Sequence, residues 1–207
     1  MLNELQAWKG PFGDQYTLRN SVEWRSRVDG FRSIFSGFSV KRVLEVGCNR
    51  GHNLVALSEI LAQPPELVGV EPNHSALRLA RRSTDKAGFL PGTIYDLPFK
   101  NGYFDLVFTC GVLIHIPNES LAAALRELDR VTSRYFLLME YYSEQDEEIV
   151  YRGERGLLWK RNFPLHVMKA CDHLTLTKKG YLGPEQGFDR THWWLMERGA
   201  GKGAGQA

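Results

Sequence analysis

Short apolar runs alternate with amphipathic stretches along most of the chain. The apolar runs predict strands at residues 42–47, 67–71, 89–95, 104–110 and 135–141. The amphipathic stretches predict helices at residues 53–63 and 75–87, and a further helix whose apolar stripe is Leu121, Ala124, Leu125, Leu128 and Val131. Strands that alternate with helices indicate βαβ units and a parallel sheet, in which a continuously apolar strand is central.

The N-terminal part has a different pattern. Trp8, Phe12 and Tyr16 stand among Gly and Pro residues, which predicts an ordered arm anchored by aromatic rings. Apolar residues then recur at helical spacing, so that a helix is predicted at residues 21–38, with Ser21 as its N-cap.

The C-terminal part completes the predicted organisation. Residues 173–177 and 192–197 predict an antiparallel edge hairpin, and the small residues of 199–207 predict a flexible tail. We therefore predict an α/β fold with a Rossmann-like doubly wound sheet that is mostly parallel and has an antiparallel C-terminal edge strand. The sheet domain is expected at residues 39–198, and the N-terminal arm and helix at residues 1–38 are expected to cover the active site.

Composition narrows the class of partner. The chain has 43% hydrophobic and 24% charged residues, which is typical of a globular protein and excludes wholesale disorder. Its 26 basic and 24 acidic residues give a net charge of +2, and this balance offers no electrostatic reason to expect a nucleic-acid partner. A small-molecule partner is therefore favoured over a nucleic acid. The protein itself is expected to be a monomer or a homodimer.

The cysteines and the apolar runs limit the other partners. Cys48, Cys110 and Cys171 lie far apart without CxxC spacing, so that neither a metal site nor a disulfide framework is predicted. No apolar run approaches the roughly 20 residues needed to span a bilayer, and the N-terminus does not resemble a signal peptide. We expect a cytoplasmic protein without membrane contact.

The segment VLEVGCNRG carries the first candidate chemistry. It follows the first strand of a doubly wound sheet, where a ligand meets the carboxyl ends of the strands. Gly47 permits a tight turn, and Asn49 tolerates a left-handed conformation. A dinucleotide fingerprint would have glycines at 47, 49 and 52, but Asn49 and His52 occupy two of these positions. Glu45 would repel a pyrophosphate and favours a cationic ligand.

Glu71 ends the second predicted strand. An acid at this position can accept hydrogen bonds from both hydroxyls of a ribose, in dehydrogenases and in methyltransferases alike. The alternative is a solvated carboxylate at the end of a strand.

These motifs together resemble the class I S-adenosylmethionine (SAM)-dependent methyltransferases. The resemblance spans residues 42–116 and rests on EVGCNRG, VGVEPN, DLPF and FDLVFTCGVLIHI in this order. It implies SAM as the cofactor. The residues expected to bind SAM are Glu45, Gly47, Cys48, Asn49, Gly51, Glu71, Pro72, Thr93, Ile94, Tyr95 and Cys110.

One position departs from the family pattern. Many class I enzymes place an acidic residue after the third strand, where this chain has Thr93. Asp96 or the backbone around Ile94 could take its place in binding the adenine amino group, although Asp96 could equally cap a turn.

The flanking segments resemble a narrower group. WKGPFGDQYTLRN, FTCGVLIHIP, MEYYS and YRGERGLLWKRNF are similar to the methylases associated with pseudaminic acid biosynthesis, over nearly all of residues 8–197. This resemblance implies a bacterial sugar or a related small molecule as the methyl acceptor.

Candidate catalytic residues follow the fourth and fifth strands. His115 has an ordinary pKa near ~6.5, which suits a general base, but it could instead be a packing residue. Glu140 and Tyr142 end the fifth strand and would face one side of it, and Tyr141 the other. We expect catalytic roles for His115, Glu140 and Tyr142, and contact with the substrate for Tyr141.

Further candidates lie outside the core motifs. The basic residues Arg152, Arg155, Lys160 and Arg161 could bind a carboxylate or phosphate of the acceptor, or form an ordinary solvated surface. In the arm, Tyr16 could contact the acceptor and Arg19 could pair with the SAM carboxylate.

Two other function classes remain open. A nicotinamide-dependent oxidoreductase also uses a glycine loop and an acid at the second strand, and a SAM-binding fold can act without catalysis. A methyltransferase of this class could also act on RNA or protein. The sequence leaves methylation of oxygen and of nitrogen equally open.

Overall fold

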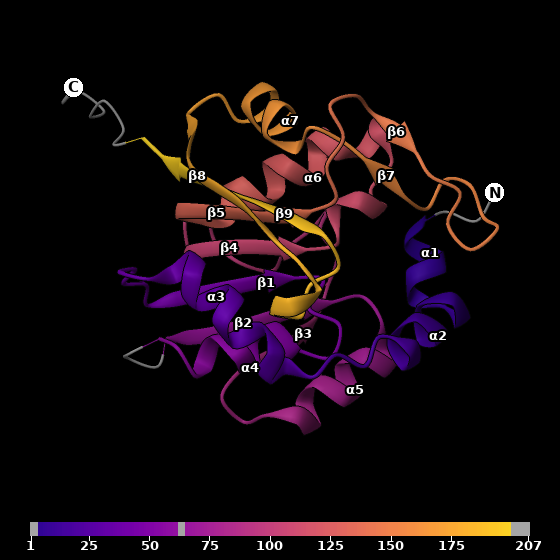
Figure 1. The fold of residues 1–207 in the computed structure, drawn as a ribbon, viewed down its shortest axis with the longest axis horizontal. Helices are drawn as coiled ribbons and strands as arrows, with labels where there is room; N and C mark the ends of the chain where they lie inside the picture. The colour runs from indigo at the N-terminus through magenta and orange to yellow at the C-terminus, as the bar shows by residue number, and fades with distance from the viewer. Residues whose placement is uncertain (1–3, 62–64, 200–207) are drawn as a thin grey trace.

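A seven-stranded sheet runs through the middle of the computed structural model, which describes residues 4–61 and 65–199 (Figure 1). Its strands are β1 (Arg42–Val46), β2 (Glu66–Glu71), β3 (Gly88–Pro91), β4 (Phe104–Cys110), β5 (Thr132–Glu140), β8 (Leu174–Leu182) and β9 (Thr191–Arg198). Their order is β3-β2-β1-β4-β5-β9-β8, parallel from β3 to β5, with β9 antiparallel to both of its neighbours. The predicted fold class is confirmed, and the strand order reverses between β1 and β4, where ligands bind in such sheets.

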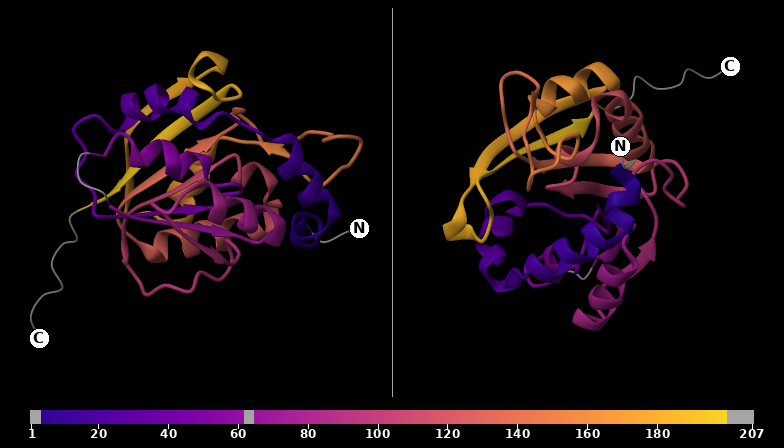
Figure 2. Two further views of the ribbon diagram at one scale, coloured as in Figure 1. Left: turned by 90° about the horizontal axis from the view of Figure 1, so that it is seen from below. Right: turned by 90° about the vertical axis from the view of Figure 1, so that its right-hand side faces the viewer.

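Helices cover both faces of the sheet (Figures 1 and 2). On one face lie α3 (Val28–Phe35), α4 (His52–Ser58) and α5 (His74–Ser83), and on the other lie α6 (Asn118–Val131) and α7 (Phe163–Ala170). Each layer buries its own apolar cluster against the sheet. Of the helices described at residues 4–61 and 65–199, none is long and apolar enough to cross a membrane.

Strand β9 illustrates how the sheet separates the two clusters. Trp194 and Met196 pack in the cluster of α6 and α7, whereas Leu195 packs in the cluster of α3, α4 and α5. This is the alternation expected from the sequence of the strand. The strand pairs with β5 over Tyr135–Glu140, so that the antiparallel hairpin of β8 and β9 extends the sheet and its core.

Two short segments meet at the carboxyl ends of the parallel strands. The N-terminal arm consists of α1 (Glu4–Lys9) and α2 (Pro11–Arg19), and a small hairpin of β6 (Glu147–Glu148) and β7 (Trp159–Lys160) follows β5. The loop of this hairpin lies beside the arm in Figures 1 and 2, and the rings of Phe12 and Tyr151 are 6.3 Å apart. The expected N-terminal helical arm is present, whereas the sequence did not indicate the hairpin.

Several predicted boundaries are wrong. The stretch 21–38 is a 3-10 turn, η1 (Trp24–Arg27), followed by the shorter α3, and its first cap is Glu23 rather than Ser21 because the Glu23 carboxylate accepts the Arg25 amide. Asn73 caps α5, which ends at Ser83.

Strand β3 ends at Pro91, and α4 ends at Ser58. The last residues of the helix predicted at 53–63 and most of the predicted tail fall at 62–64 and 200–207, outside the described residues.

Gly69 in β2 generates a prediction about packing. A Cβ atom there would lie 2.6 Å from the Cys48 Sγ and 2.8 Å from the Phe89 ring. We expect Gly69→Ala to lower the free energy of unfolding by about 1–3 kcal/mol because the overpacked core must shift. The matched control is Gly88→Ala, where the nearest atom is 4.0 Å from the added Cβ. Chemical denaturation measures both, and equal effects would refute the packing argument.

Candidate active site

The loop after β1 turns through left-handed conformations. Gly47, Asn49 and Gly51 have φ angles of 76°, 46° and 73°. A Cβ atom on Gly47 would lie 2.5 Å from the Val112 side chain, so that this loop touches the turn after β4 directly. Asn49 was expected to tolerate the left-handed conformation, and it adopts it.

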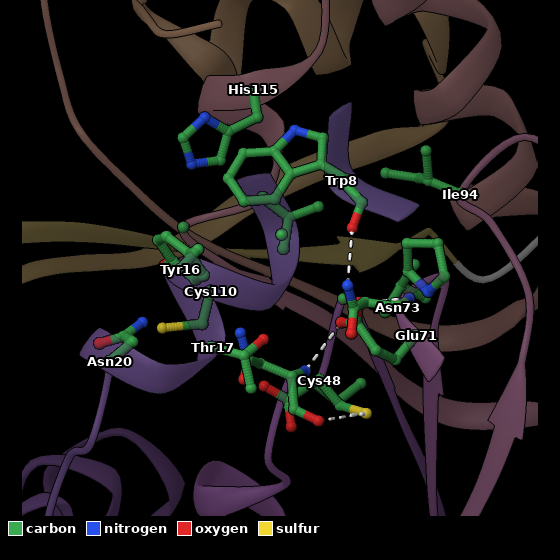
Figure 3. A pocket seen from close by; sticks show the side chains of 18 of the residues that line it. Trp8, Tyr16, Thr17, Asn20, Cys48, Glu71, Asn73, Ile94, Cys110 and His115 are labelled. Atoms are coloured by element: carbon green, nitrogen blue, oxygen red, sulfur yellow. Dashed lines mark hydrogen bonds between the residues drawn. The ribbon is translucent and has the colours of Figure 1, made fainter. Parts of the chain in front are cut away.

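A pocket lies beyond this loop, at the carboxyl ends of β1 to β4 (Figure 3). The empty space between its walls is about 1070 Å³, which includes open solvent at its mouth. The predicted site residues that line it are Tyr16, Glu45, Gly47, Cys48, Asn49, Glu71, Pro72, Thr93, Ile94, Tyr95, Cys110 and His115. Residues from the ends of four strands, β1 to β4, and from the arm are therefore brought together.

Other predicted site residues lie outside the lining of this pocket. They are Arg19, Gly51, Glu140, Tyr141, Tyr142, Arg152, Arg155 and Lys160. Gly51 begins α4 against the Phe89 ring, behind the loop that lines the pocket.

The side chains after β5 have other partners. The Tyr141 hydroxyl donates to the Asp189 carboxylate at 2.7 Å, and the Tyr142 ring packs 5.3 Å from His192. Strand β5 ends at Glu140, so that the expected alternation of the two tyrosines does not apply. Glu140 is fully buried and bonded to the turn after β4.

The predicted basic residues lie on the hairpin. Arg152 and Arg155 are exposed on its loop, and Lys160 lies in β7. The Arg152 guanidinium lies 5.7 Å from the centre of the Tyr151 ring. These cations are therefore at the rim beside the arm rather than in the pocket.

Glu45 is a buried carboxylate with one free oxygen. Its side chain is almost completely buried, its Oε1 accepts a hydrogen bond from Asn53 Nδ2 at 2.6 Å, and its Oε2 has no partner among the described residues. Burial raises the pKa of Glu45 to about 8, against the effects of Asn53 and of the nearby Arg27. A cationic ligand group at Oε2 would supply the missing partner.

Glu71 presents both oxygens at the end of β2. Oε2 accepts the Asn49 amide and Oε1 accepts the Asn73 amide, each at 2.9 Å. Burial raises the pKa of Glu71, and these two bonds oppose the shift. Each carboxylate oxygen can accept a further bond, so that Glu71 can receive two adjacent ligand hydroxyls.

Arg27 lines the pocket, and the sequence analysis did not select it. Its Nη1 donates to Asn53 Oδ1 at 2.6 Å and its Nε donates to the Gly187 carbonyl at 3.0 Å. The predicted Arg19 is exposed at the end of α2. No local pattern separates Arg27 from its neighbour Arg25, because the partners that orient it are 26 and 160 residues away in the chain.

His115 faces the pocket from η2 (Leu113–His115), with a fixed tautomer. Its Nδ1 lies 2.5 Å from the Leu157 carbonyl, which can only accept, so that Nδ1 carries the proton and Nε2 is the acceptor. Burial lowers the pKa of His115 to about 4, so that the ring is neutral at pH 7. The Trp8 ring lies 4.4 Å from it.

The arm is tied to the pocket by polar and aromatic contacts. Asn73 Nδ2 donates to the Trp8 carbonyl at 3.0 Å and to Asp14 Oδ1 at 3.1 Å, and the first of these bonds is drawn in Figure 3. The Tyr95 hydroxyl donates to Glu4 at 3.0 Å. Trp8 also contacts Tyr16 edge to face, at 5.1 Å. The arm therefore forms the roof of the pocket, with contacts to Asn73 after β2 and to Tyr95 after β3.

Comparison with known proteins concerns the fold and the central part of the chain. Residues 43–134, less than half of the chain, match the model of a methyltransferase domain family. Solved proteins of the same fold include magnesium protoporphyrin IX methyltransferase with bound SAM or SAH.

Several solved structures share the fold of this chain. Magnesium protoporphyrin IX methyltransferase of Synechocystis, solved with bound SAM, superposes with a TM-score of 0.70 at 13% identity, over 96% of this chain and 98% of that one. The 1,6-didemethyltoxoflavin-N1-methyltransferase of Burkholderia thailandensis gives 0.66 at 16% identity, over 90% and 83% of the two chains. At these identities the likeness concerns the fold alone.

Curated relatives match about half of the chain in sequence. An uncharacterized methyltransferase of Schizosaccharomyces pombe is 37% identical over 102 residues, 44% of this chain and 36% of that protein. A tRNA U34 carboxymethyltransferase of Pseudomonas aeruginosa is 38% identical over 121 residues, 55% of this chain and 37% of that protein. The match thus spans little more than a third of the length of these relatives.

The raised pKa of Glu45 predicts how the stability of the protein depends on pH. A carboxyl with a pKa of about 8 in the folded chain and 4.5 in the unfolded chain binds its proton more tightly when folded, so that stability falls as pH rises through this window. His52 and His115, with pKa values lowered to about 4, act oppositely only below pH 6.5. Between pH 7 and 8 we expect a loss of about 1 kcal/mol.

Thermal unfolding of the free protein measures this effect. A loss of about 1 kcal/mol corresponds to about 2–4 °C in melting temperature for a chain of this size. Glu45→Gln should flatten the dependence between pH 7 and 8. Glu66→Gln, at the exposed start of β2, should keep it. Parallel curves for the wild type and Glu45→Gln would contradict the assignment.

Proposed function

We propose that this chain transfers the methyl group of SAM to an oxygen or nitrogen of a small molecule. The observation that carries the proposal is the pair of buried carboxylates, Glu45 and Glu71, in one pocket under the arm. A ligand with a cationic end and two adjacent hydroxyls satisfies both, whereas a pyrophosphate would be repelled by Glu45. The pair therefore favours SAM over a nicotinamide cofactor.

Each carboxylate has a proposed partner on SAM. Glu71 would accept hydrogen bonds from the two ribose hydroxyls while keeping its bonds to the Asn49 and Asn73 amides. Glu45 would receive the ammonium group at Oε2, which has no partner among the described residues. A positive charge there would also favour the ionised form of Glu45, whose pKa burial raises to about 8.

Arg27 replaces Arg19 as the proposed partner of the SAM carboxylate. Its bonds to Gly187 and Asn53 engage Nε and Nη1, while Nη2 takes part in neither. Because Asn53 also donates to Glu45, one amide side chain orients both charged groups. For the adenine we propose Ile94 as apolar wall and the backbone of 93–95 as polar partner, since Thr93 is not acidic.

The transfer is an in-line displacement at the methyl carbon. SAM supplies a methyl group bonded to a positively charged sulfur, which is a good leaving group. With SAM bound, the acceptor oxygen or nitrogen would form a bond to the methyl carbon while the carbon–sulfur bond breaks with its electron pair going to sulfur, and the proton of the acceptor would pass to solvent. Alignment supplies much of the rate in such reactions.

His115 is the proposed contact for the proton of the acceptor. Its Nε2 is an acceptor because the Leu157 carbonyl holds the proton on Nδ1. With a pKa of about 4, it orients the acceptor hydroxyl or amine through a hydrogen bond more readily than it takes the proton outright. Trp8 Nε1, buried without a partner among the described residues, would donate to an acceptor oxygen.

The acceptor class follows from the roof and the rim. Trp8, Tyr16 and His115 give the acceptor side of the pocket aromatic walls, and Arg152 and Arg155 lie at the rim. A sugar acid or related metabolite combines apolar ring faces, hydroxyls and a negative charge. The similarity to methylases associated with pseudaminic acid biosynthesis points to the same class.

A transfer to tRNA is the second candidate. The tRNA U34 carboxymethyltransferase relatives favour it, at 32–38% identity over about half of this chain. Against it stand the net charge of +2 and the roofed pocket, which would have to admit a nucleotide extruded from its strand.

The role of Glu71 is tested through SAM affinity. We expect Glu71→Ala to weaken SAM binding about tenfold or more, because two ribose hydroxyls lose their acceptor. Glu66→Ala, at the other end of the same strand, is the matched control and should bind as the wild type does. Titration calorimetry decides between them, and equal affinities of all three proteins would reject the assignment.

The acceptor is tested with methyl-labelled SAM. We expect labelled methyl groups in a pool of nucleotide sugars and free sugar acids, detected by mass spectrometry, and none with Glu71→Ala. Bulk tRNA is incubated in parallel. Label in tRNA alone would replace the small-molecule proposal with the second candidate, and SAM binding without transfer to either pool would count against both acceptor classes.

A further inference from the structure

The turn that carries His115 is held from inside by two buried charges. This turn, Val112–Ile116, follows β4 and contains η2. The amides at the start of this turn are bonded outside it, and the Leu113 carbonyl accepts the Ile116 amide at 3.1 Å within it. Glu140 meets the amides, and Arg161 meets the carbonyls.

Glu140 closes the start of the turn. It is the last residue of β5 and is completely buried. Its Oε1 accepts the amides of Val112 and Leu113 at 3.2 and 3.1 Å, and its Oε2 accepts the amide of Ile114 at 3.3 Å. A negative charge at the amide end of a helical turn is electrostatically favourable.

Arg161 closes the other end of the turn. It follows β7 and is also completely buried. Its Nη1 donates to the Leu113 carbonyl at 3.2 Å and its Nη2 donates to the Ile116 carbonyl at 2.9 Å. Nε and Nη2 also donate to Asn118 Oδ1, at 3.0 and 2.7 Å. The planar guanidinium thus donates hydrogen bonds to three acceptors at once.

We propose that Glu140 and Arg161 are positioning residues that fix the ring of His115 for methyl transfer. The inference rests on the proposed function of His115, and it gives Glu140 a different role from the catalytic one expected from the sequence. The Leu157 carbonyl that sets the His115 tautomer lies in the hairpin segment that leads to Arg161. The two charges therefore fix the main chain of the turn and, through the hairpin, the partner of the ring.

The cost of burying these charges argues for a role beyond stability. Burial raises the pKa of Glu140 to about 7 and lowers that of Arg161 to about 10, so that keeping either group charged has an energetic cost. Well-packed apolar residues often give equal or greater stability than a buried ion pair. In this turn, Glu140 and Arg161 hold the main-chain amides and carbonyls in one arrangement.

The experiment compares conservative variants with a matched control. Glu140→Gln keeps the shape but faces main-chain amides with a donor, and Arg161→Lys keeps the charge but loses the fork. The control is Asp105→Asn, because Asp105 also accepts two main-chain amides, those of Lys41 and Arg42 at 2.7 and 2.9 Å, but at the opposite end of the sheet. All three changes remove main-chain bonding, and two of them act on the His115 turn.

The first readout is the His115 ring itself, by NMR of its nitrogens in the full chain without ligand. In the wild type we expect the Nδ1–H tautomer and a pKa of about 4. In Glu140→Gln and Arg161→Lys we expect a mixture of tautomers and a pKa that moves toward the ordinary value near ~6.5. Asp105→Asn should give the wild-type spectrum. A wild-type ring in both folded turn variants would overturn the proposal.

The second readout separates binding from transfer, with the acceptor found using labelled SAM. We expect the turnover of the two turn variants to fall about tenfold to a hundredfold, as for a misplaced group, while SAM affinity changes less than about threefold. An equal loss in Asp105→Asn would mean that stability alone is responsible and would refute the proposal. Absence of SAM binding in the wild type would refute the proposed function, while the ring spectra would still judge the positioning pair.

A gentler variant covers the case in which the buried substitutions do not fold. Asn118 is exposed, and its side chain anchors two nitrogens of Arg161. Asn118→Ala should shift the His115 ring signals in the same direction by a smaller amount. An unshifted ring in folded Asn118→Ala, with both buried variants unfolded, would count against the proposal.

Discussion

The burial of the Glu71 carboxylate constrains much of the site. A carboxylate out of water needs donors, and the chain provides the amide of Asn49 from the β1 loop and the amide of Asn73 from the start of α5. Asn73 in turn caps α5 and donates to the arm through its side chain. One buried charge is therefore connected by hydrogen bonds to the glycine loop, to a helix start and to the roof. The loop after β1, the end of β2 and the arm are therefore joined by one network of hydrogen bonds.

The sequence predicted the parts of the molecule that depend on local pattern. Periods of two and of 3.6 residues place the strands and helices, and the left-handed Asn49 follows from residue type. The carboxylates at 45 and 71 were found because strand ends in such a sheet share one edge. Helix ends were less predictable, since the cap of α5 is an asparagine that also serves the arm.

The sequence could not predict contacts between distant segments. Arg27 is oriented by Asn53 and by the Gly187 carbonyl, and nothing near it in the chain signals this. Glu140 was expected to be catalytic because it ends a central strand, but its carboxylate accepts hydrogen bonds from the amides of the turn after β4. Arg161 is completely buried although it belongs to a run of basic residues that otherwise lies at the surface. In each case a partner far along the chain decides where a charged side chain points.

The contact between Gly47 and Val112 has an evolutionary consequence. The cofactor loop and the His115 turn touch so closely that any side chain at position 47 would collide with Val112. A lineage that replaces Gly47 would need a smaller residue at 112, and the left-handed backbone at 47 would penalise even that paired change. Homologues of this chain should therefore vary at these two positions together or not at all. Covariation of positions 47 and 112 would therefore link the loop after β1 to the turn after β4.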